Sequence, residues 1–140
     1  MNKKYDQKNK LEQPTINEKP TGELTLRTLA MPADANPAGD IFGGWVLSQM
    51  DMAGGICAAK EAKCRVVTVS IEAMSFLRPV HIGDVLCVYS SIKTIGQTSI
   101  GIYMEAWALR DRLGDRVKVT DGIFTFVALN EQGNSVPIYR

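Results

Sequence analysis

The alternation of hydrophobic and polar positions divides the chain of 140 residues into a tail, a helix and a set of strands. Residues 1–22 show no periodicity and are rich in Lys, Asn, Gln and Glu, which predicts a disordered polar tail. Residues 23–29 alternate in the manner of a strand. From about residue 41 or 43 to residue 61, apolar side chains such as Val46 and Met50 recur at helical spacing, which predicts a long helix with one packing face.

Alternation with a period of two returns after this helix and predicts further strands. They are expected at residues 67–73, 85–95, 98–109 and 116–129, with a tight turn at Gly96-Gln97. Strands joined by such short connections are antiparallel. A strand, a long helix and four more strands therefore predict an α+β fold, a five-stranded antiparallel sheet packed on one helix. We expect residues 23–140 to form a single domain.

Composition and charge exclude several classes of function. The chain is 45% hydrophobic with a net charge of +1, so nothing favours binding to nucleic acid or to an anionic membrane surface. No segment approaches the roughly 18 apolar residues of a membrane span. The cysteines Cys57, Cys64 and Cys87 lack the spacing of metal or redox sites. We expect buried thiols, a cytoplasmic location, no metal and no cofactor.

Asp51 is the strongest candidate for chemistry. It is the one charged residue between Gly43 and Ala59, where the other residues are apolar, small or uncharged. Burying a charge is costly, so a carboxylate in such company is normally paired or functional. Two interpretations remain: a catalytic acid, or a structural acid paired with a neighbour.

The predicted start of the helix offers a second chemical feature. The first amides of a helix have no partner within it, and the helix dipole favours negative charge there. Gly43 and Gly44 would let a substrate approach these amides closely, or they would serve tight packing. Gly43 and Asp51 would lie about 12 Å apart along one helix, so one helix cannot bring both to one carbonyl group. A site shared between two subunits can.

Two residues before this start have two interpretations each. Asp40 is a candidate cap of the helix, because its side-chain oxygen can accept from the first amides. It is also a candidate catalytic residue that positions water or substrate. Asn36 is a candidate substrate-binding residue or a former of the turn.

Taken together, the chain resembles the YciA-type acyl-CoA thioesterases of the hotdog fold. The resemblance rests on the residues at 26–32, 39–45, 48–51, 65–69, 76–79 and 83–85. It implies a sheet wrapped around the central helix and hydrolysis of acyl-CoA to a carboxylic acid and CoA. It further implies a homo-oligomer with a dimer as the minimal active unit, commonly a trimer of dimers, that is, a homohexamer.

The resemblance also implies roles for single residues. Asp51 matches the catalytic acid of the family and would act as general base, with direct nucleophilic attack as the alternative. CoA carries phosphates, so basic and polar residues are expected along its path. The candidates for contact with the substrate or CoA are Thr68, Arg78, Lys93, Gln97, Thr98 and Ser99, and each could equally be an ordinary surface residue.

Two other functions are compatible with the same fold. Hotdog dehydratases and hydratases usually rely on a catalytic histidine, and His81 lies in a predicted loop far along the sequence from the helix start. The other alternative is a non-catalytic, regulatory domain that binds acyl-CoA, which would retain CoA binding without hydrolysis.

Overall fold

The computed structural model describes residues 18–110 and 114–139. The predicted disordered tail comprises residues 1–22, of which residues 1–17 lie outside this part of the chain. The elements, in chain order, are β1 (Glu23–Leu29), the short 3-10 helix η1 (Pro32–Asp34), α2 (Gly43–Ala62), β2 (Arg65–Ile71), β3 (Val85–Ile95), β4 (Ser99–Leu109) and β5 (Arg116–Leu129). None of the helices among these residues is long and apolar enough to cross a bilayer.

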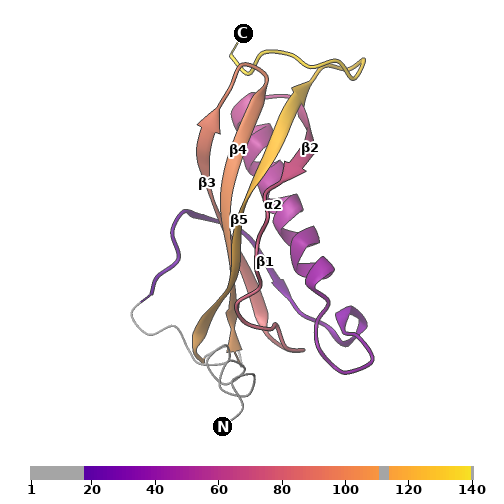
Figure 1. The fold of residues 1–140 in the computed structure, drawn as a ribbon, viewed down its shortest axis with the longest axis vertical. Helices are drawn as coiled ribbons and strands as arrows, with labels where there is room; N and C mark the ends of the chain where they lie inside the picture. Colours follow the sequence, from indigo (N-terminus) through magenta and orange to yellow (C-terminus); the bar gives the residue numbers. More distant parts are fainter. Residues whose placement is uncertain (1–17, 111–113, 140) are drawn as a thin grey trace.

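The strands form one antiparallel sheet in the order β1-β3-β4-β5-β2. The sheet curls around α2, which runs diagonally across its concave face (Figure 1). The two strands that flank the helix in the sequence, β1 and β2, are the two edges of the sheet, and β3, β4 and β5 form its centre. The predicted fold class is confirmed, and the predicted boundaries of the helix and strands agree with the structure to within two residues.

The buried face of α2 is the one that the helical spacing predicts. Val46 and Met50 are almost fully buried against the sheet. Gly54 lies at the closest approach, because a Cβ atom there would lie 2.8 Å from Cε of Met104 and 2.8 Å from Cζ of Phe126. Glycine at this position therefore lets the helix pack tightly on β4 and β5.

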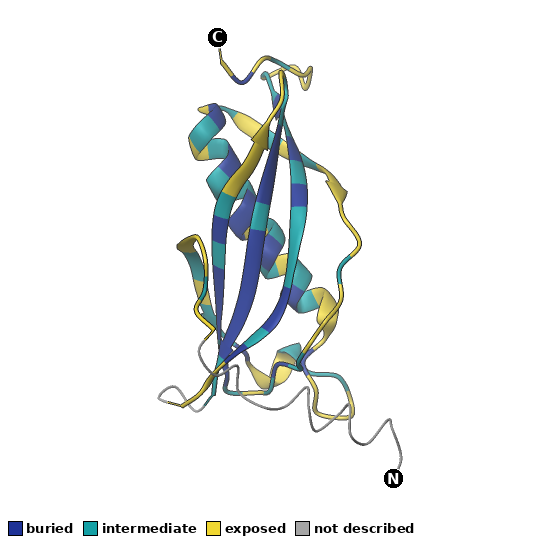
Figure 2. Ribbon diagram, turned by 60° about the vertical axis from the view of Figure 1, so that its left-hand side comes forward, coloured by how far each residue is buried: buried dark blue, intermediate teal, exposed yellow. Residues whose placement is uncertain are grey.

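The central strand β4 is buried on both of its faces, as the dark strands of Figure 2 show. On the convex face, which points away from the helix, lies a buried carboxylate, Glu105, with only 4% exposure. It accepts hydrogen bonds from the Thr21 hydroxyl (2.6 Å), the Tyr103 hydroxyl (2.9 Å) and Nε1 of Trp107 (2.9 Å). The Thr21 amide donates as well, at 3.2 Å. Glu105 thus binds the segment before β1 to the sheet.

These donors set the protonation of Glu105. Burial by itself would raise the pKa of this carboxyl, but the hydrogen bonds from Thr21, Trp107 and Tyr103 outweigh it and lower the pKa below its ordinary value. The pKa of Tyr103 is raised, first by burial and then by its hydrogen bond to Glu105. The Glu105 carboxylate is therefore ionised, and its role is structural.

The edge strand β2 presents apolar side chains that one chain leaves uncovered. Val67, Val69 and Ile71 are 43%, 54% and 46% exposed, respectively. Their alternation in the sequence is that of a half-buried strand, yet nothing in the described part of a single chain covers them. An exposed apolar edge strand is a surface on which another chain can pair.

Candidate active site

The loop before α2 shapes the start of the helix without a side-chain cap. The N-cap residue is Phe42, whose backbone is extended (φ −61°, ψ 135°). The prediction that Asp40 caps the helix is therefore wrong. Asp40 stands two residues too early for its side chain to reach the first amides, and its backbone instead pairs with that of His81. Asp40 is exposed on the loop, and its catalytic role stays a prediction.

Asn36 organises this loop. Its Oδ1 accepts hydrogen bonds from the amides of Ala38 (2.9 Å) and Asp40 (3.1 Å), and its own amide donates to the Asp40 carbonyl (2.7 Å). This is the geometry of a turn former. The side-chain oxygen is thereby used within the loop, and binding of substrate by Asn36 remains a prediction.

Gly43 and Gly44 provide open amides at the positive end of the helix dipole. Both residues are exposed, and a Cβ atom at Gly44 would meet no atom within 4 Å. The amide of Trp45 donates to the Phe42 carbonyl (3.1 Å), whereas no hydrogen bond among the described residues uses the amide of either glycine. Two amide donors at an exposed helix start are therefore without a described acceptor, as an oxyanion donor requires.

Asp51 lies half-buried further along the same helix and is held from the edge strand. The Thr68 hydroxyl of β2 donates to Oδ1 of Asp51 at 2.6 Å. Among the described residues, Oδ2 accepts no hydrogen bond, and no Lys, Arg or His forms an ion pair with this carboxylate. A neutral hydroxyl orients the group, and one oxygen stays available for a reaction. This counts against the interpretation as a structural ion pair.

The two features lie apart within one chain. Because α2 is continuous from Gly43 to Ala62, the separation of eight positions between Gly43 and Asp51 places them about 12 Å apart along the axis. One carbonyl group cannot contact both. The expectation that a complete site needs two copies of the chain is consistent with this geometry.

Residues 76–80, in the segment that follows β2, form a fixed wall beside the helix start. The Leu77 amide donates to the Val119 carbonyl at 2.7 Å. Further on, Arg110 donates from Nη1 to Oδ2 of Asp84 (2.6 Å) and from Nη2 to the Pro79 carbonyl (2.9 Å). This ion pair is largely buried, with side-chain exposures of 16% and 5%. The wall is thus tied to β5 and to Arg110, the residue directly after β4.

Between this wall and the helix start lies a groove of about 260 Å³. Gly43 lies at its rim, and a Cβ atom there would lie 3.5 Å from the ring of Phe76. The side chains along it are mostly apolar: Ile41, Val46, Phe76, Leu77, Val80 and Val119. Sequence reasoning missed this groove and gave Phe76 no role. The available signal was two large apolar residues, Phe76 and Leu77, directly after a strand and before Arg78-Pro79.

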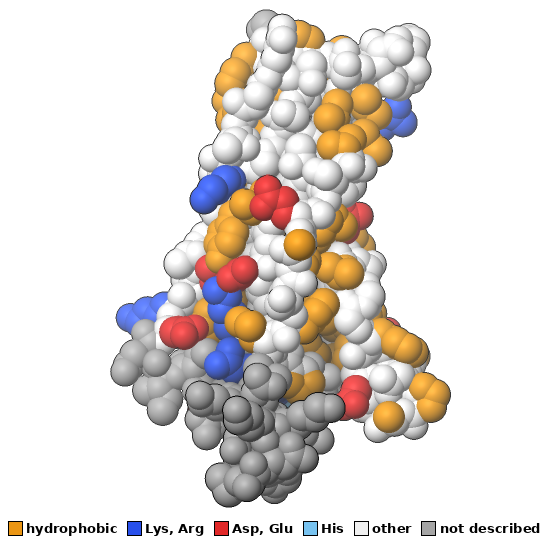
Figure 3. Space-filling view, viewed as in Figure 1, with side chains coloured by type: hydrophobic (Ala, Val, Ile, Leu, Met, Phe, Trp, Pro, Cys, Tyr) orange, Lys and Arg blue, Asp and Glu red, His pale blue; other side chains and the backbone are white. Residues whose placement is uncertain are grey.

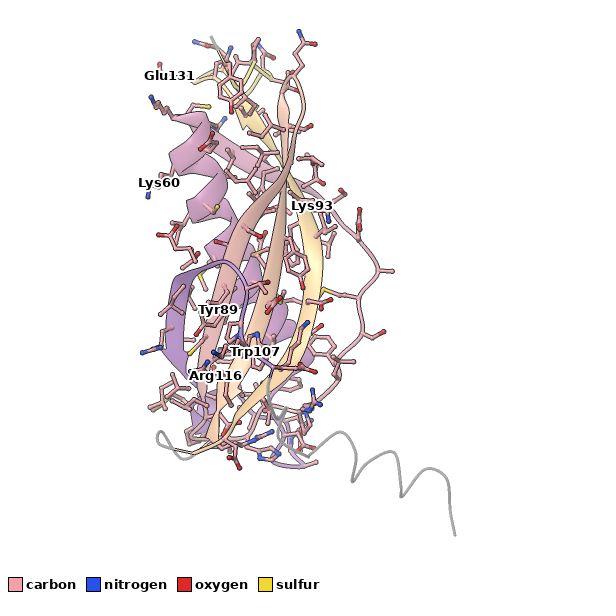
Figure 4. The ribbon with its side chains drawn as sticks, turned by 90° about the vertical axis from the view of Figure 1, so that its left-hand side faces the viewer. Lys60, Tyr89, Lys93, Trp107, Arg116 and Glu131 are labelled. Atoms are coloured by element: carbon pink, nitrogen blue, oxygen red, sulfur yellow. The ribbon has the colours of Figure 1, made fainter. Side chains whose placement is uncertain are left out.

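The predicted CoA-binding residues do not gather in one place within a chain. Arg78 lines the groove, and its Nη1 donates to the Lys118 carbonyl at 3.0 Å. Thr68 lies on β2, where its hydroxyl donates to Asp51. Four more belong to the β3–β4 hairpin, at the opposite end of the molecule from Gly43 (Figure 1): Lys93, Gln97, Thr98 and Ser99. Figure 4 shows Lys93 on the opposite side of the sheet from Lys60 of α2. Their roles in binding CoA stay predictions.

Charged and metal-ligating side chains are not concentrated in one place in the described part of the chain. Figure 3 shows acidic and basic side chains interspersed on one face of the molecule, without a broad patch of one sign. Among the described residues, no three His, Cys, Asp or Glu side chains come together as metal ligands would.

A curled sheet around a helix with an oriented carboxylate and open amino-terminal amides defines a hotdog protein equipped for acyl chemistry. Residues 38–114 match the thioesterase superfamily, and the chain belongs to that family. The acyl-CoA thioester hydrolase YciA of Salmonella typhimurium is 50% identical over 127 residues, 89% of this chain and 96% of that protein. YciA of Escherichia coli is 49% identical over 122 residues, 85% and 92% of the two chains. The resemblance inferred from the sequence is confirmed.

Solved structures agree with the fold. A hexameric thioesterase from Yersinia pestis is 49% identical with a TM-score of 0.81, covering 85% of this chain and 97% of that one. A hexameric hotdog fold thioesterase of Campylobacter jejuni is 44% identical with a TM-score of 0.78, covering 83% and 90%.

Proposed function

We propose that this protein hydrolyses acyl-CoA thioesters to a carboxylic acid and CoA, with Asp51 as general base. The observation that carries the proposal is the half-buried Asp51 carboxylate, oriented through Oδ1 by Thr68 at 2.6 Å, on the helix whose first amides are open. The relatives named as acyl-CoA thioester hydrolases support the choice of substrate.

The reaction needs a base and a donor for the oxyanion. Oδ2 of Asp51 takes a proton from water while the water oxygen attacks the thioester carbonyl carbon. The amide of Gly43 or Gly44 donates to the carbonyl oxygen as it becomes negative. The tetrahedral intermediate then expels the CoA sulfur, which receives the proton from Asp51. Direct attack by the Asp51 carboxylate on the carbonyl carbon is the alternative.

Two copies of the chain complete the site in this proposal. The carboxylate comes from one copy and the amide from the other, since about 12 Å separates them along one helix. The uncovered apolar side chains of Val67, Val69 and Ile71 on edge strand β2 support pairing of two copies. The relatives from Yersinia pestis and Campylobacter jejuni are hexamers, which supports a trimer of dimers. Three free cysteines and a CoA substrate support a cytoplasmic location.

The test is thiol release from a panel of acyl-CoAs by the wild type and by Asp51→Asn. This isosteric change keeps the size of the side chain and removes the base, so we expect kcat to fall by at least about 100-fold. Glu61→Gln is the matched control, because it makes the same chemical change on the same helix, where Glu61 accepts a hydrogen bond from the Tyr139 hydroxyl (3.2 Å). We expect it to keep kcat within about twofold, as surface substitutions away from a site usually do.

Size-exclusion chromatography shows whether each variant assembles like the wild type. Full activity of a correctly assembled Asp51→Asn protein would refute the role of Asp51. If the wild type binds CoA but hydrolyses no acyl-CoA, the protein is instead a non-catalytic acyl-CoA-binding domain.

A further inference from the structure

Apart from Gly43, the residues that line the groove beside the start of α2 have no part in the chemistry proposed above. The groove has a volume of about 260 Å³, and Gly43 lies at its rim. A thioester bound to the amide of Gly43 or Gly44 extends in two directions from its carbonyl carbon, as the acyl chain and as the pantetheine arm of CoA. The groove lies next to that carbon and can take one of the two.

The lining of the groove favours the acyl chain. Seven apolar side chains, Pro79 among them, form most of it, and the guanidinium of Arg78 donates to the Lys118 carbonyl at 3.0 Å. The pantetheine arm contains two amide groups, which would lose their hydrogen bonds to water on entering such a groove, and this is costly. An alkyl chain has no polar group and gains free energy from burial.

Phe76 is placed to decide how much of that chain is buried. Its ring lies at the rim, 3.5 Å from where a Cβ atom of Gly43 would be. Its neighbours are fixed, since the Leu77 amide donates to the Val119 carbonyl (2.7 Å) and the Thr120 hydroxyl donates to the Ser75 carbonyl (2.7 Å). Phe76 itself is 41% exposed. The ring therefore flanks the mouth of the groove from a rigid segment, and changing it leaves the core intact.

We infer that the groove receives the acyl chain of the substrate and that Phe76 is a residue that determines the preference for chain length. This inference rests on the proposed acyl-CoA hydrolysis. Each methylene that enters an apolar groove contributes about 0.8 kcal/mol, equivalent to about a fourfold rise in kcat/KM. The groove is finite, with a volume of about 260 Å³, so we expect the rise to end once the chain fills it.

The test measures kcat/KM for saturated acyl-CoAs from two to twelve carbons, each divided by the value for acetyl-CoA of the same variant. For the wild type we expect a rise of about fourfold per methylene. Phe76→Ala removes one side of the groove, so we expect less than about twofold per methylene. Phe76→Trp narrows the mouth, so we expect the rise to end at a shorter chain. Ile95→Ala is the control, because Ile95 is another exposed apolar residue (36%) at the far hairpin, and we expect the wild-type profile.

The outcomes separate this inference from the function on which it rests. A wild type that hydrolyses no acyl-CoA overturns both. A wild type that hydrolyses acyl-CoAs with the same profile in Phe76→Ala and Phe76→Trp overturns the inference alone. A fall in kcat/KM by the same factor at every acyl length leaves the normalised profile unchanged and also overturns the inference. Phe76 would then support the helix start and would not contact the acyl chain.

Discussion

Two adjacent glycines of α2 provide a sharp test of how the helix packs on the sheet. Replacing a glycine in the interior of a helix by alanine stabilises the helix by about 1 kcal/mol in either position. At Gly55 a new Cβ atom would meet Cε1 of Phe126 at 3.8 Å, an ordinary contact. At Gly54 it would lie 2.8 Å from both Cε of Met104 and Cζ of Phe126. The Met104 methyl can move aside, but the buried ring of Phe126 cannot do so without shifting its neighbours.

The two substitutions are therefore expected to have opposite effects. Gly55→Ala raises the free energy of unfolding by about 1 kcal/mol. Overpacking a core typically costs about 1–3 kcal/mol, so Gly54→Ala lowers the free energy of unfolding by up to about 2 kcal/mol after the helical gain is subtracted. Urea denaturation followed by tryptophan fluorescence measures both, with all proteins at the same concentration because association adds to stability. Equal free energies of unfolding for the two variants would refute the reasoning.

Two further predictions concern hydrogen bonds to carboxylates. Thr68→Val removes the donor at 2.6 Å from Asp51. Since a hydrogen bond to a charged group contributes about 1.5–3 kcal/mol, we expect kcat to fall by at least about tenfold, while Thr68→Ser retains most of the rate. Equal rates for Thr68→Val and the wild type in steady-state assays would contradict this. Glu105→Gln is expected to lower the free energy of unfolding by about 1–2 kcal/mol near pH 7. Because the pKa of Glu105 is lowered in the folded protein, its stabilisation is present above the ordinary carboxyl pKa and is lost as the pH falls through the folded value. Urea denaturation across this range is expected to show the difference from the wild type shrinking on acidification, and a difference that grows instead would contradict the assignment.

The sequence predicts the elements well because hydrophobic periodicity reports directly on burial within a helix or strand. The packing face of α2 around Val46 and Met50 is an example. The sequence does not predict partners that the fold brings together from different elements. The bond between Thr68 of β2 and Asp51 of α2 depends on how an edge strand lies against the helix, and no spacing encodes it.

The criterion that selects Asp51 also fits a residue with a different role. Glu105 is the one charged residue among its apolar neighbours in β4, and it is far more buried than Asp51. Three side chains and one amide fill its hydrogen-bonding capacity, whereas Asp51 has a single described donor and a free oxygen. An acidic residue among apolar neighbours therefore predicts an unusual environment. The number of hydrogen-bond donors around its carboxylate then distinguishes a structural acid from a catalytic one.

The hydrogen bonds from Thr21 to Glu105 bear on where the folding unit of this protein begins. Secondary structure alone would place that boundary at Glu23, and the family match begins only at residue 38. A truncation at either point would leave a buried carboxylate without two of its donors. The few residues that precede the first strand are thus a constraint on how the amino terminus can be shortened, fused or exchanged among relatives, and a boundary drawn from alignment alone would cut through the structure that it is meant to preserve.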